Sequence, residues 1–325
     1  MTVDLFAQLG ISAEMARLES YMGGLVTSPV FALSQPARYI LTSGGKRLRA
    51  ALAFLAARLS GGPIPESAVY AAAAVELIHA ASLVHDDLID QSPHRRGRPT
   101  IHEKWHHDVA LLAGDYLFAL AARAITLTGS VAVMDHISAA ATAVCEGEIS
   151  NVDEVTPLED ALESYRFKIG HKTAALFEAA GKVGAACGGG DEKSIDAIGQ
   201  FGYTLGMAFQ IVDDVLDYVG DEGRLGKPAG GDLRRGLITL PLIYAVSYDD
   251  PDGYLQHAVE RFGNSLSPEE FAEALRRVRS SAGPERARRD AEGYYQEGLQ
   301  YLAPLPSPAR ASLEEIARQM VERAY

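Results

Sequence analysis

The chain has 325 residues, of which 47% are hydrophobic and 22% are charged. This composition is that of an ordinary globular protein and excludes disorder as the main state. Its 30 basic and 43 acidic residues give a net charge of −13, which argues against sequence-independent binding to nucleic acid. The only cysteines, Cys145 and Cys187, are too few for a disulfide scaffold and are typical of a reducing compartment.

The first 20 residues carry acidic side chains where a secretory signal would be basic and then apolar, so export is not expected. The most apolar stretches lie at 68–75 and 109–122, where Glu76 and Asp115 interrupt them. Both are shorter than the roughly 20 residues that a membrane-spanning helix needs. We therefore expect a soluble, cytoplasmic chain with no transmembrane segment.

Apolar residues recur at steps of three and four along most of the chain, which is the spacing of one helix face. This periodicity predicts helices over residues 46–60, 66–90, 107–127, 131–149, 171–187 and 191–219, and more in the C-terminal third. Glycine- and proline-rich turns separate these segments, and no long window alternates as a strand does. We predict an all-α fold that forms one large helical domain over residues 1–325.

The predicted helix 66–90 ends in three carboxylates, Asp86, Asp87 and Asp90. Residues four apart share a helix face, so Asp86 and Asp90 point the same way while Asp87 is turned by about 100°. Two like charges stacked in this way are unfavourable unless a cation lies between them. Magnesium fits because it prefers hard oxygen ligands and is often completed by a substrate's phosphates.

The same arrangement recurs at the end of the predicted helix 191–219, with Asp213, Asp214 and Asp217. One such triplet arises by chance in roughly one chain in a dozen and is weak evidence, whereas two on separate apolar helices are much stronger evidence. Basic residues suited to a diphosphate stand nearby in the sequence. They are Arg95 and Arg96 after the first triplet, and Lys46, Arg47 and Arg49 far upstream, where Lys46 and Arg49 can share one helix face and Arg47 diverges.

These motifs resemble those of the trans-isoprenyl diphosphate synthases, also called the polyprenyl synthetase family. Residues 83–90 with Arg95-Arg96-Gly97 resemble its first aspartate-rich signature, and residues 205–217 resemble the second. Shorter matches stand in family order at Gly44–Arg49, Glu76–His79, Lys172-Thr173 and Gly226–Pro228. The resemblance implies a helical bundle of the isoprenoid synthase type with a central active-site cavity, and a homodimer, since relatives usually are dimers.

The resemblance further implies an enzyme that condenses isopentenyl diphosphate head-to-tail onto an allylic diphosphate. Mg²⁺ ions, about three per site, would neutralise the leaving diphosphate. The metal ligands would be Asp86, Asp90 and Asp213, with Arg95 and Lys227 adding positive charge. The residues that would hold isopentenyl diphosphate without metal are Lys46, Arg49, His79 and Arg96, and those that would flank the allylic cation are Lys172, Thr173 and Gln210.

Small residues precede the first aspartates. Ala81 and Ser82 lie about one turn before Asp86, where the growing chain would descend, and relatives with short products often carry aromatic residues there. We therefore expect a medium- or long-chain product of about six to ten isoprene units. A short-chain synthase that makes farnesyl or geranylgeranyl diphosphate is the alternative.

Several other interpretations stay open at this stage. His102-Glu103-Lys104-Trp105-His106 satisfies the zinc-protease pattern HExxH, although no third ligand is indicated. Residues 220–228 only superficially match a phosphate-binding loop, because Pro228 replaces the required Ser or Thr. A terpene cyclase would not need a second diphosphate site. A non-catalytic subunit of a heteromeric synthase is favoured by Leu237, which replaces a common lysine, unless Arg234 or Arg235 compensates.

Overall fold

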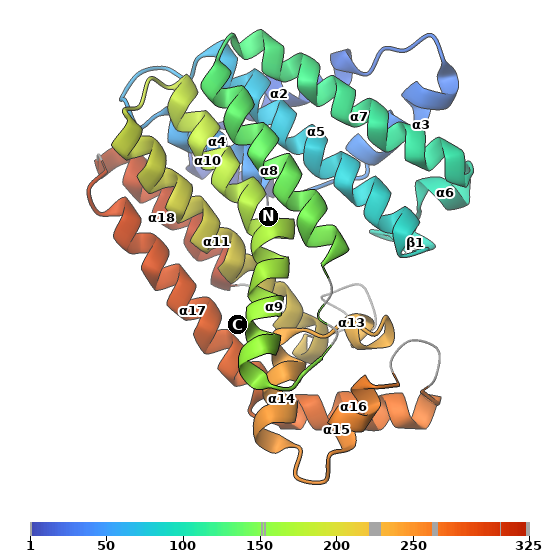
Figure 1. The fold of residues 1–325 in the computed structure, drawn as a ribbon. Helices are drawn as coiled ribbons and strands as arrows, with labels where there is room; N and C mark the ends of the chain where they lie inside the picture. The colour runs from blue at the N-terminus through green and yellow to red at the C-terminus, as the bar shows by residue number, and fades with distance from the viewer. Residues whose placement is uncertain are drawn as a thin grey trace. The chain divides into compact units, whose positions relative to one another are not determined.

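The computed structural model describes residues 2–150, 152, 154–220, 229–261, 266–305 and 307–322. Within these ranges the chain is helical, apart from turns and one antiparallel pair of two-residue strands, so the all-α prediction is confirmed (Figure 1). The residues group into two compact units, each described by itself below. Unit 1 comprises Met1–Val144, Leu176–Gly202 and Tyr301–Ile316, and unit 2 comprises Cys145–Ala175, Tyr203–Gln300 and Ala317–Tyr325. The expectation of one domain over residues 1–325 stays a prediction.

The elements that lie wholly in unit 1 precede residue 130. They are α1 (Thr2–Gln8), α2 (Ser12–Leu25), α3 (Phe31–Leu41), α4 (Leu48–Ala57), α5 (Glu66–Ile89), β1 (His94–Arg95), β2 (Arg98–Pro99), α6 (Ile101–Lys104) and α7 (His107–Thr128). The alanine-rich helix α5 is buried along most of its length and packs beside α7 (Figure 1). A side chain at Gly114 of α7 would collide with the imidazole of His85 on α5. The missing side chain therefore allows these two helices to approach closely.

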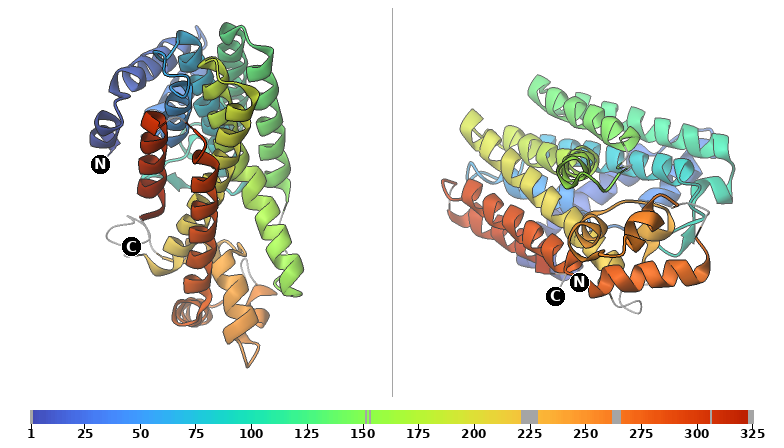
Figure 2. Two further views of the ribbon diagram at one scale, coloured as in Figure 1. Left: turned by 90° about the vertical axis from the view of Figure 1, so that its left-hand side faces the viewer. Right: turned by 60° about the horizontal axis from the view of Figure 1, so that its bottom comes forward.

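The elements that lie wholly in unit 2 follow residue 157. They are α9 (Leu158–Ile169), the π-helical turn η1 (Gly170–Ala174), α13 (Gly231–Arg234), α14 (Leu240–Asp249), α15 (Tyr254–Val259) and α16 (Pro268–Ser280). Figure 2 shows α15 and α16, both orange, side by side. The hydrophobic core of this unit contains Tyr165, Ile211, Tyr218 and Leu242, each at most 1% exposed. This core fixes α9 and the C-terminal half of α11 (Glu192–Val219), and α11 carries the predicted site residues Gln210 and Asp213.

Unit boundaries fall within the remaining helices. These are α8 (Val131–Ile149), α10 (Ala175–Cys187), α11 (Glu192–Val219), α17 (Gly283–Leu302) and α18 (Ser307–Val321). In unit 1, side chains at Gly184 of α10 and at Gly188, directly after this helix, would collide with the backbone of α4. Glycine at these two positions lets α10 pack directly against α4, which carries Arg49.

The predicted helices differ from the observed ones at two places. The helix expected over 46–60 begins only at Leu48, because Arg47 has a left-handed backbone with φ of 47° and ends the helical path there. The helix expected over 171–187 starts in the wider π-helical turn η1, which contains Lys172 and Thr173. Such π turns recur at functional sites in proteins.

Two helices contain a longer apolar stretch than expected. α5 has 24 residues and α7 has 22, and by length and composition both could span a membrane, so the expectation of shorter apolar segments is wrong. Glu76 interrupts the apolar run of α5 but stays buried in it, because Arg47 compensates its charge. The most apolar part of α5 is 72% buried, as in the core helix of a folded domain, whereas that of α7 is only 39% buried.

Candidate active site

The three carboxylates of the first acidic motif lie in the last turn of α5 and differ in burial. Asp86 and Asp87 are 8% and 4% exposed, whereas Asp90 forms the C-cap of the helix and is exposed. The helix dipole places partial negative charge at this end, so it disfavours carboxylates there. The motif therefore gathers negative charge at a position where a bound cation is stabilising.

Arg95 neutralises one of these carboxylates. The strands β1 and β2 form a tight hairpin in which Arg96 and Gly97 have positive φ angles of 53° and 73°. This turn directs the Arg95 guanidinium toward Asp87, and its Nε donates a hydrogen bond of 2.7 Å to Asp87 Oδ2. In the structure Arg95 contacts Asp87, and its contact with a diphosphate stays a prediction.

The predicted helical pairing of Lys46 with Arg49 is wrong. Lys46 lies before the start of α4, because the left-handed backbone of Arg47 separates it from the helix that carries Arg49. Arg47 itself forms ion pairs with Glu19 at 2.7 Å and with buried Glu76 at 3.2 Å. Glu76 Oε1 also accepts a hydrogen bond from the Ala50 backbone N–H at 3.2 Å. The loop before α4 is thus anchored to α5.

Positive side chains surround His79 in unit 1. Loss of hydration, followed by the charges of Arg49 and Arg96, lowers the pKa of His79 well below its ordinary value, and Arg95 and Arg47 act in the same direction. Loss of hydration and the charges of Arg95 and Arg47 also lower the pKa of Arg96. Cations that lower one another's pKa favour the arrival of an anion. This group, which we call the basic cluster, consists of Arg47, Arg49, His79, Arg95 and Arg96.

Contacts with neighbouring groups fix two members of the basic cluster. The Arg49 guanidinium carbon lies 4.4 Å from the ring centre of Phe177 on α10. The guanidinium of Arg96 lies against the backbone of Gly45, where an added Cβ would come within 3.4 Å of Nη1. Lys46 is exposed beside them in the chain. Four residues predicted to bind isopentenyl diphosphate, Lys46, Arg49, His79 and Arg96, therefore belong to one unit.

The second acidic motif lies in the part of α11 that belongs to unit 2, and its three carboxylates have different surroundings. Asp213 is exposed, whereas Asp214 and Asp217 are 4% and 2% exposed. Asp217 Oδ2 accepts a hydrogen bond of 2.8 Å from the Asp232 backbone N–H, and its carbonyl accepts one of 2.7 Å from Gly230 N–H. Asp217 thus anchors the start of α13, and Asp213 is the residue of this motif that solvent reaches.

A chain of hydrogen bonds joins two of the residues predicted to flank the allylic cation. Thr173 Oγ1 donates to Gln210 Oε1 at 2.9 Å, and Gln210 Nε2 donates to Asp214 Oδ1 at 2.8 Å. Tyr165 OH donates to the other oxygen, Asp214 Oδ2, at 2.6 Å. Burial raises the pKa of Asp214 well above its ordinary value, Asp232 adds to this, and the hydrogen bonds from Tyr165 and Gln210 oppose it.

Lys172, the third predicted residue, precedes Thr173 in η1. Its ammonium forms an ion pair with Glu148 of α8. A side chain at Gly147 would collide with the backbone of Lys172, and one at Gly170 would collide with the Tyr203 hydroxyl. The two glycines therefore let η1 lie close to α8 and α11 within unit 2.

The segment after α11 contains the cations that were expected to add positive charge near the diphosphate, namely Lys227 and, in place of the lysine replaced by Leu237, Arg234 or Arg235. Lys227 lies outside the described residues, as do residues 221–228 as a whole. Arg234 stacks on the ring of Phe271 at 4.2 Å, and Arg235 Nη2 donates to Asp232 Oδ1 at 2.7 Å. Leu237 is partly buried and donates its backbone N–H to the Asp232 carbonyl at 2.9 Å.

The zinc-protease pattern is excluded by the backbone. α6 ends at Lys104, between the two histidines, and His106 is extended with φ of −178° and ψ of 165°. His102 and His106 therefore do not share a helix face, which zinc binding by this motif requires. Across the described ranges, no group of three or more His, Cys, Asp or Glu side chains is arranged to hold a metal by itself.

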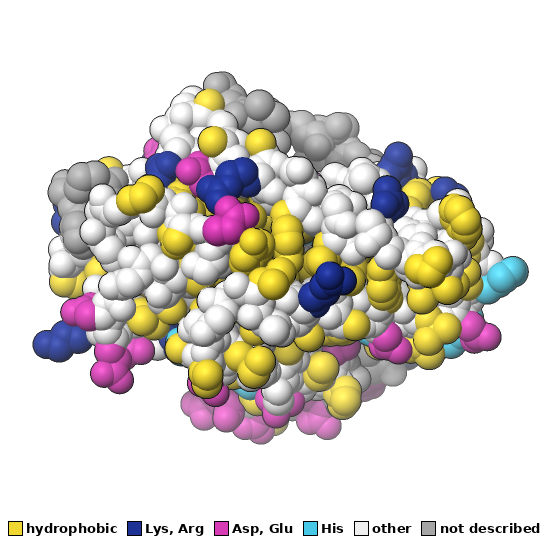
Figure 3. Space-filling view, turned by 90° about the horizontal axis from the view of Figure 1, so that it is seen from above, with side chains coloured by type: hydrophobic (Ala, Val, Ile, Leu, Met, Phe, Trp, Pro, Cys, Tyr) yellow, Lys and Arg dark blue, Asp and Glu magenta, His cyan; other side chains and the backbone are white. Residues whose placement is uncertain are grey.

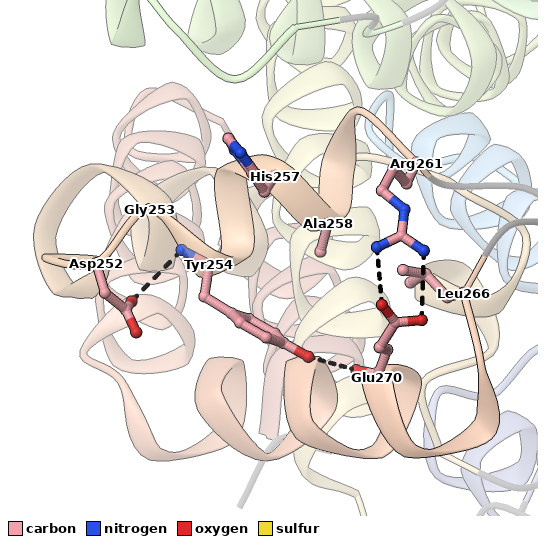
Figure 4. A pocket seen from close by; sticks show the side chains of 8 residues that line it. All are labelled: Asp252, Gly253, Tyr254, His257, Ala258, Arg261, Leu266 and Glu270. Atoms are coloured by element: carbon pink, nitrogen blue, oxygen red, sulfur yellow. Dashed lines mark hydrogen bonds and ion pairs between the residues drawn. The ribbon is translucent and has the colours of Figure 1, made fainter.

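A pocket of about 260 Å³ lies between α15 and α16 in unit 2, away from these motifs in sequence (Figure 4). Its Arg261 and Glu270 pair with each other at 2.7 Å, and its Asp252 pairs at 2.7 Å with Arg277, which is not a lining residue. Tyr254 OH also donates to the Glu270 carbonyl at 3.3 Å. None of the predicted site residues lines this pocket, and it offers no convergent set of reactive groups.

Comparison with known proteins agrees with the motifs. The family model described as "Polyprenyl synthetase" matches residues 31–277. The chain is 36% identical over 316 residues to heptaprenyl diphosphate synthase component 2 of Geobacillus stearothermophilus, covering 97% of both chains. It is 32% identical to nonaprenyl diphosphate synthase of Mycobacterium tuberculosis, covering 96% of this chain and 93% of that one. A crystal structure of polyprenyl synthase from Caulobacter crescentus, complexed with calcium and isoprenyl diphosphate, superposes with a TM-score of 0.91 at 33% identity, covering 100% of this chain and 98% of that one.

The all-α fold and the two aspartate-rich helix ends define a prenyltransferase that acts on isoprenyl diphosphates. The chain belongs to the polyprenyl synthetase family. It is thus an enzyme of isoprenoid biosynthesis that makes trans-polyprenyl diphosphates.

Three residues that anchor the motifs within their own units were not expected: Glu76 beside Arg47 in unit 1, and Glu148 beside Lys172 and Tyr165 beside Asp214 in unit 2. Glu76 interrupts an apolar run, and this was a visible sign of a buried partner. No sequence pattern links Tyr165 to Asp214, which lies 49 residues away.

Proposed function

We propose that this chain is a Mg²⁺-dependent synthase that extends an allylic diphosphate with isopentenyl diphosphate to a medium- or long-chain product. The observation that carries the proposal is the basic cluster around His79, which meets the first acidic helix end where Arg95 pairs with Asp87. A terpene cyclase binds one diphosphate and has no use for a second anion site. Two kinds of diphosphate site, one basic and one acidic, suit an enzyme with two diphosphate substrates.

The acidic motifs suit magnesium. Asp86, Asp90 and Asp213 supply hard oxygen donors, and Mg²⁺ is usually bound by one or two carboxylates with substrate phosphates completing its shell. The lack of a three-ligand cluster among the described side chains agrees with such shared coordination. When bound, Mg²⁺ ions would supply the positive charge that lets the allylic diphosphate depart.

The chain's own residues divide the remaining work. Lys46, Arg49, His79 and Arg96 hold isopentenyl diphosphate by charge, without metal. Arg95 and Lys227 add positive charge toward the allylic diphosphate. Lys172, Thr173 and Gln210 flank the allylic cation, and the oxygens of Thr173 and Gln210 offer dipoles to it rather than a nucleophile that would react with it.

The product is of medium or long chain, about six to ten isoprene units, because the side chain of Ser82 on α5, about one turn before Asp86, is small. Ser82 is partly exposed, and its Oγ donates to the His79 carbonyl at 2.9 Å. The hepta- and nonaprenyl names of two relatives support this length.

The active species is a cytoplasmic homodimer formed through α7 and its neighbour α8. Large apolar side chains stay exposed on these helices: Leu111, Leu112, Leu127, Val131 and Met134. Figure 3 shows hydrophobic side chains gathered between scattered charged groups on one face of the molecule. Exposed apolar patches of this kind mark association surfaces.

The test is incubation of the purified chain with Mg²⁺, labelled isopentenyl diphosphate and a series of allylic diphosphates, followed by chromatographic sizing of the products. We expect products of about six to ten units, and no extension when EDTA removes the divalent metal. Extension that stops at farnesyl or geranylgeranyl diphosphate would establish the short-chain alternative.

A partner-dependent synthase is the second candidate function. The Geobacillus relative is named as one component of a synthase, and Leu237 replaces a cation common in the family. If the purified chain incorporates no isopentenyl diphosphate in the assay above, while a lysate of its source restores incorporation, this second function is the correct one.

A further inference from the structure

A buried tyrosine and a buried aspartate hold one end of the Gln210 side chain. Tyr165 of α9 is 1% exposed and Asp214 of α11 is 4% exposed. One oxygen of Asp214 accepts from Tyr165 at 2.6 Å, and the other accepts from Gln210 Nε2 at 2.8 Å. Neither Tyr165 nor Asp214 is accessible enough to touch a substrate, whereas Gln210 is only partly buried.

The orientation of the Gln210 amide follows from these contacts. The two ends of a glutamine amide have nearly the same shape but opposite hydrogen-bonding roles, so their partners decide which end points where. Asp214 accepts from the nitrogen end, and the oxygen end therefore accepts from Thr173 Oγ1 at 2.9 Å. Because the Thr173 hydroxyl hydrogen is used in this bond, lone pairs of both oxygens stay available to a cation.

We infer that Tyr165 and Asp214 are positioning residues, which fix the Gln210 amide so that the oxygens of Thr173 and Gln210 face the allylic cation. A reversed amide would present its positive N–H end to that cation and oppose ionisation. The inference rests on the proposed function. It adds two residues that belong neither to the proposed metal ligands, nor to the residues that bind diphosphate, nor to those that flank the allylic cation.

The ionisation of Tyr165 agrees with a donor role. Burial and the neighbouring Asp214 raise the pKa of Tyr165 well above its ordinary value. The phenol therefore keeps its hydrogen at neutral pH and has it available for the bond to Asp214.

The test is Tyr165→Phe, which removes only the hydroxyl, with Tyr244→Phe as the matched control. Tyr244 makes the same kind of bond in the same unit, from its hydroxyl to Asp290 Oδ2 at 2.7 Å, but leads to no predicted site residue. In single-turnover condensation we expect Tyr165→Phe to lower the rate about tenfold, with KM for both diphosphates within about twofold. Tyr244→Phe should stay within about twofold of the wild type in rate.

A double-mutant cycle separates positioning from general stability. If Tyr165 acts through Gln210, Tyr165→Phe should cost no further rate when Gln210→Ala is already present. The same fractional loss in both backgrounds, or a loss equal to that of Tyr244→Phe, would overturn the inference while leaving the proposed function intact. A wild-type chain that extends no allylic diphosphate would overturn the proposed function and the inference together.

A measurement on the wild type covers the case in which Tyr165→Phe does not fold. The side-chain amide protons of Gln210, assigned by NMR against Gln210→Ala, should exchange slowly with solvent because Nε2 donates to a buried carboxylate. Free exchange of these protons in the folded wild type would contradict the inference.

Discussion

The guanidinium of Arg47 lies 3.2 Å from the carboxylate of Glu76, and the two side chains are only 11% and 4% exposed. This buried ion pair joins the loop before α4 to the middle of α5, and the same carboxylate accepts the Ala50 N–H. It therefore fixes the position of Lys46 and Arg49 relative to His79 within unit 1.

Replacing Glu76 with Gln should leave the Arg47 charge poorly compensated in a buried place. We expect the free energy of unfolding to fall by about 2–3 kcal/mol, measured by chemical denaturation. We also expect KM for isopentenyl diphosphate to rise more than KM for the allylic diphosphate. The control is Glu19→Gln, because Glu19 pairs with the same arginine but is 52% exposed; its cost should stay below about 1 kcal/mol. Equal costs for the two variants would contradict this account.

His79 should be neutral in the free protein at neutral pH. Its pKa in the folded chain lies below the ordinary value of 6.5, because of lost hydration and the charges of Arg49 and Arg96. The unfolded state therefore takes up a proton first as pH falls. The stability contributed by neutral His79 is present above pH 6.5 and is lost as pH falls below it.

Binding of inorganic pyrophosphate at the basic cluster should reverse this shift, because its negative charge favours the protonated imidazole. An NMR titration of the His79 ring, assigned with His79→Asn, would show protonation at higher pH with pyrophosphate than without. A ring that titrates near 6.5 in the free protein would refute the prediction.

The second acidic motif should separate into a functional and a structural aspartate. Asp213→Ala should lower activity at least about 100-fold, since an exposed metal ligand is lost, while the free energy of unfolding changes by less than about 0.5 kcal/mol. Asp217→Ala should lower that free energy by about 1–3 kcal/mol, because the Asp232 N–H loses its buried acceptor. Paired activity and denaturation measurements check both, and destabilisation by Asp213→Ala would contradict the assignment.

Product length should respond to Ser82 rather than to Ala81. Ala81 is wholly buried, and five residues before Asp86 it is rotated by about 140° from that aspartate, whereas Ser82 is partly exposed. Ser82→Phe should shorten the products by several isoprene units, seen by chromatography. Ala81→Phe should instead cost about 1–3 kcal/mol by overpacking. An unchanged product spectrum with Ser82→Phe would show that chain length is limited elsewhere.

Leu237→Lys should restore the family cation on this segment. Arg235 pairs with Asp232, and Arg234 stacks on Phe271. Both arginines are therefore engaged in contacts within the protein, and the new lysine would add a positive charge that they do not supply to the diphosphate. We expect KM for the allylic diphosphate to fall about fivefold, measured by steady-state kinetics. Leu237→Met, which keeps the size without the charge, is the control and should leave KM unchanged.

Periodicity of apolar residues predicted most of the helices, because a helix that packs on one side must repeat every three to four residues. It failed where the backbone departs from the regular path. Arg47 takes a left-handed conformation that its side-chain ion pairs stabilise, and Thr173 sits in a π-helical turn that Gly147 and Gly170 accommodate. These departures depend on partners that are remote in sequence.

What the sequence determined by itself is the chemistry: two acidic helix ends, a set of basic residues and an all-α chain, since charge, residue type and spacing along one helix are local properties. The tertiary structure decided which members of each motif hold other parts of the protein in place. It paired Asp87 with Arg95, Arg47 with Glu76, and Asp214 with Tyr165. Those assignments depend on burial and on contacts between distant segments, which arise only when the helices pack and exclude water from the groups between them.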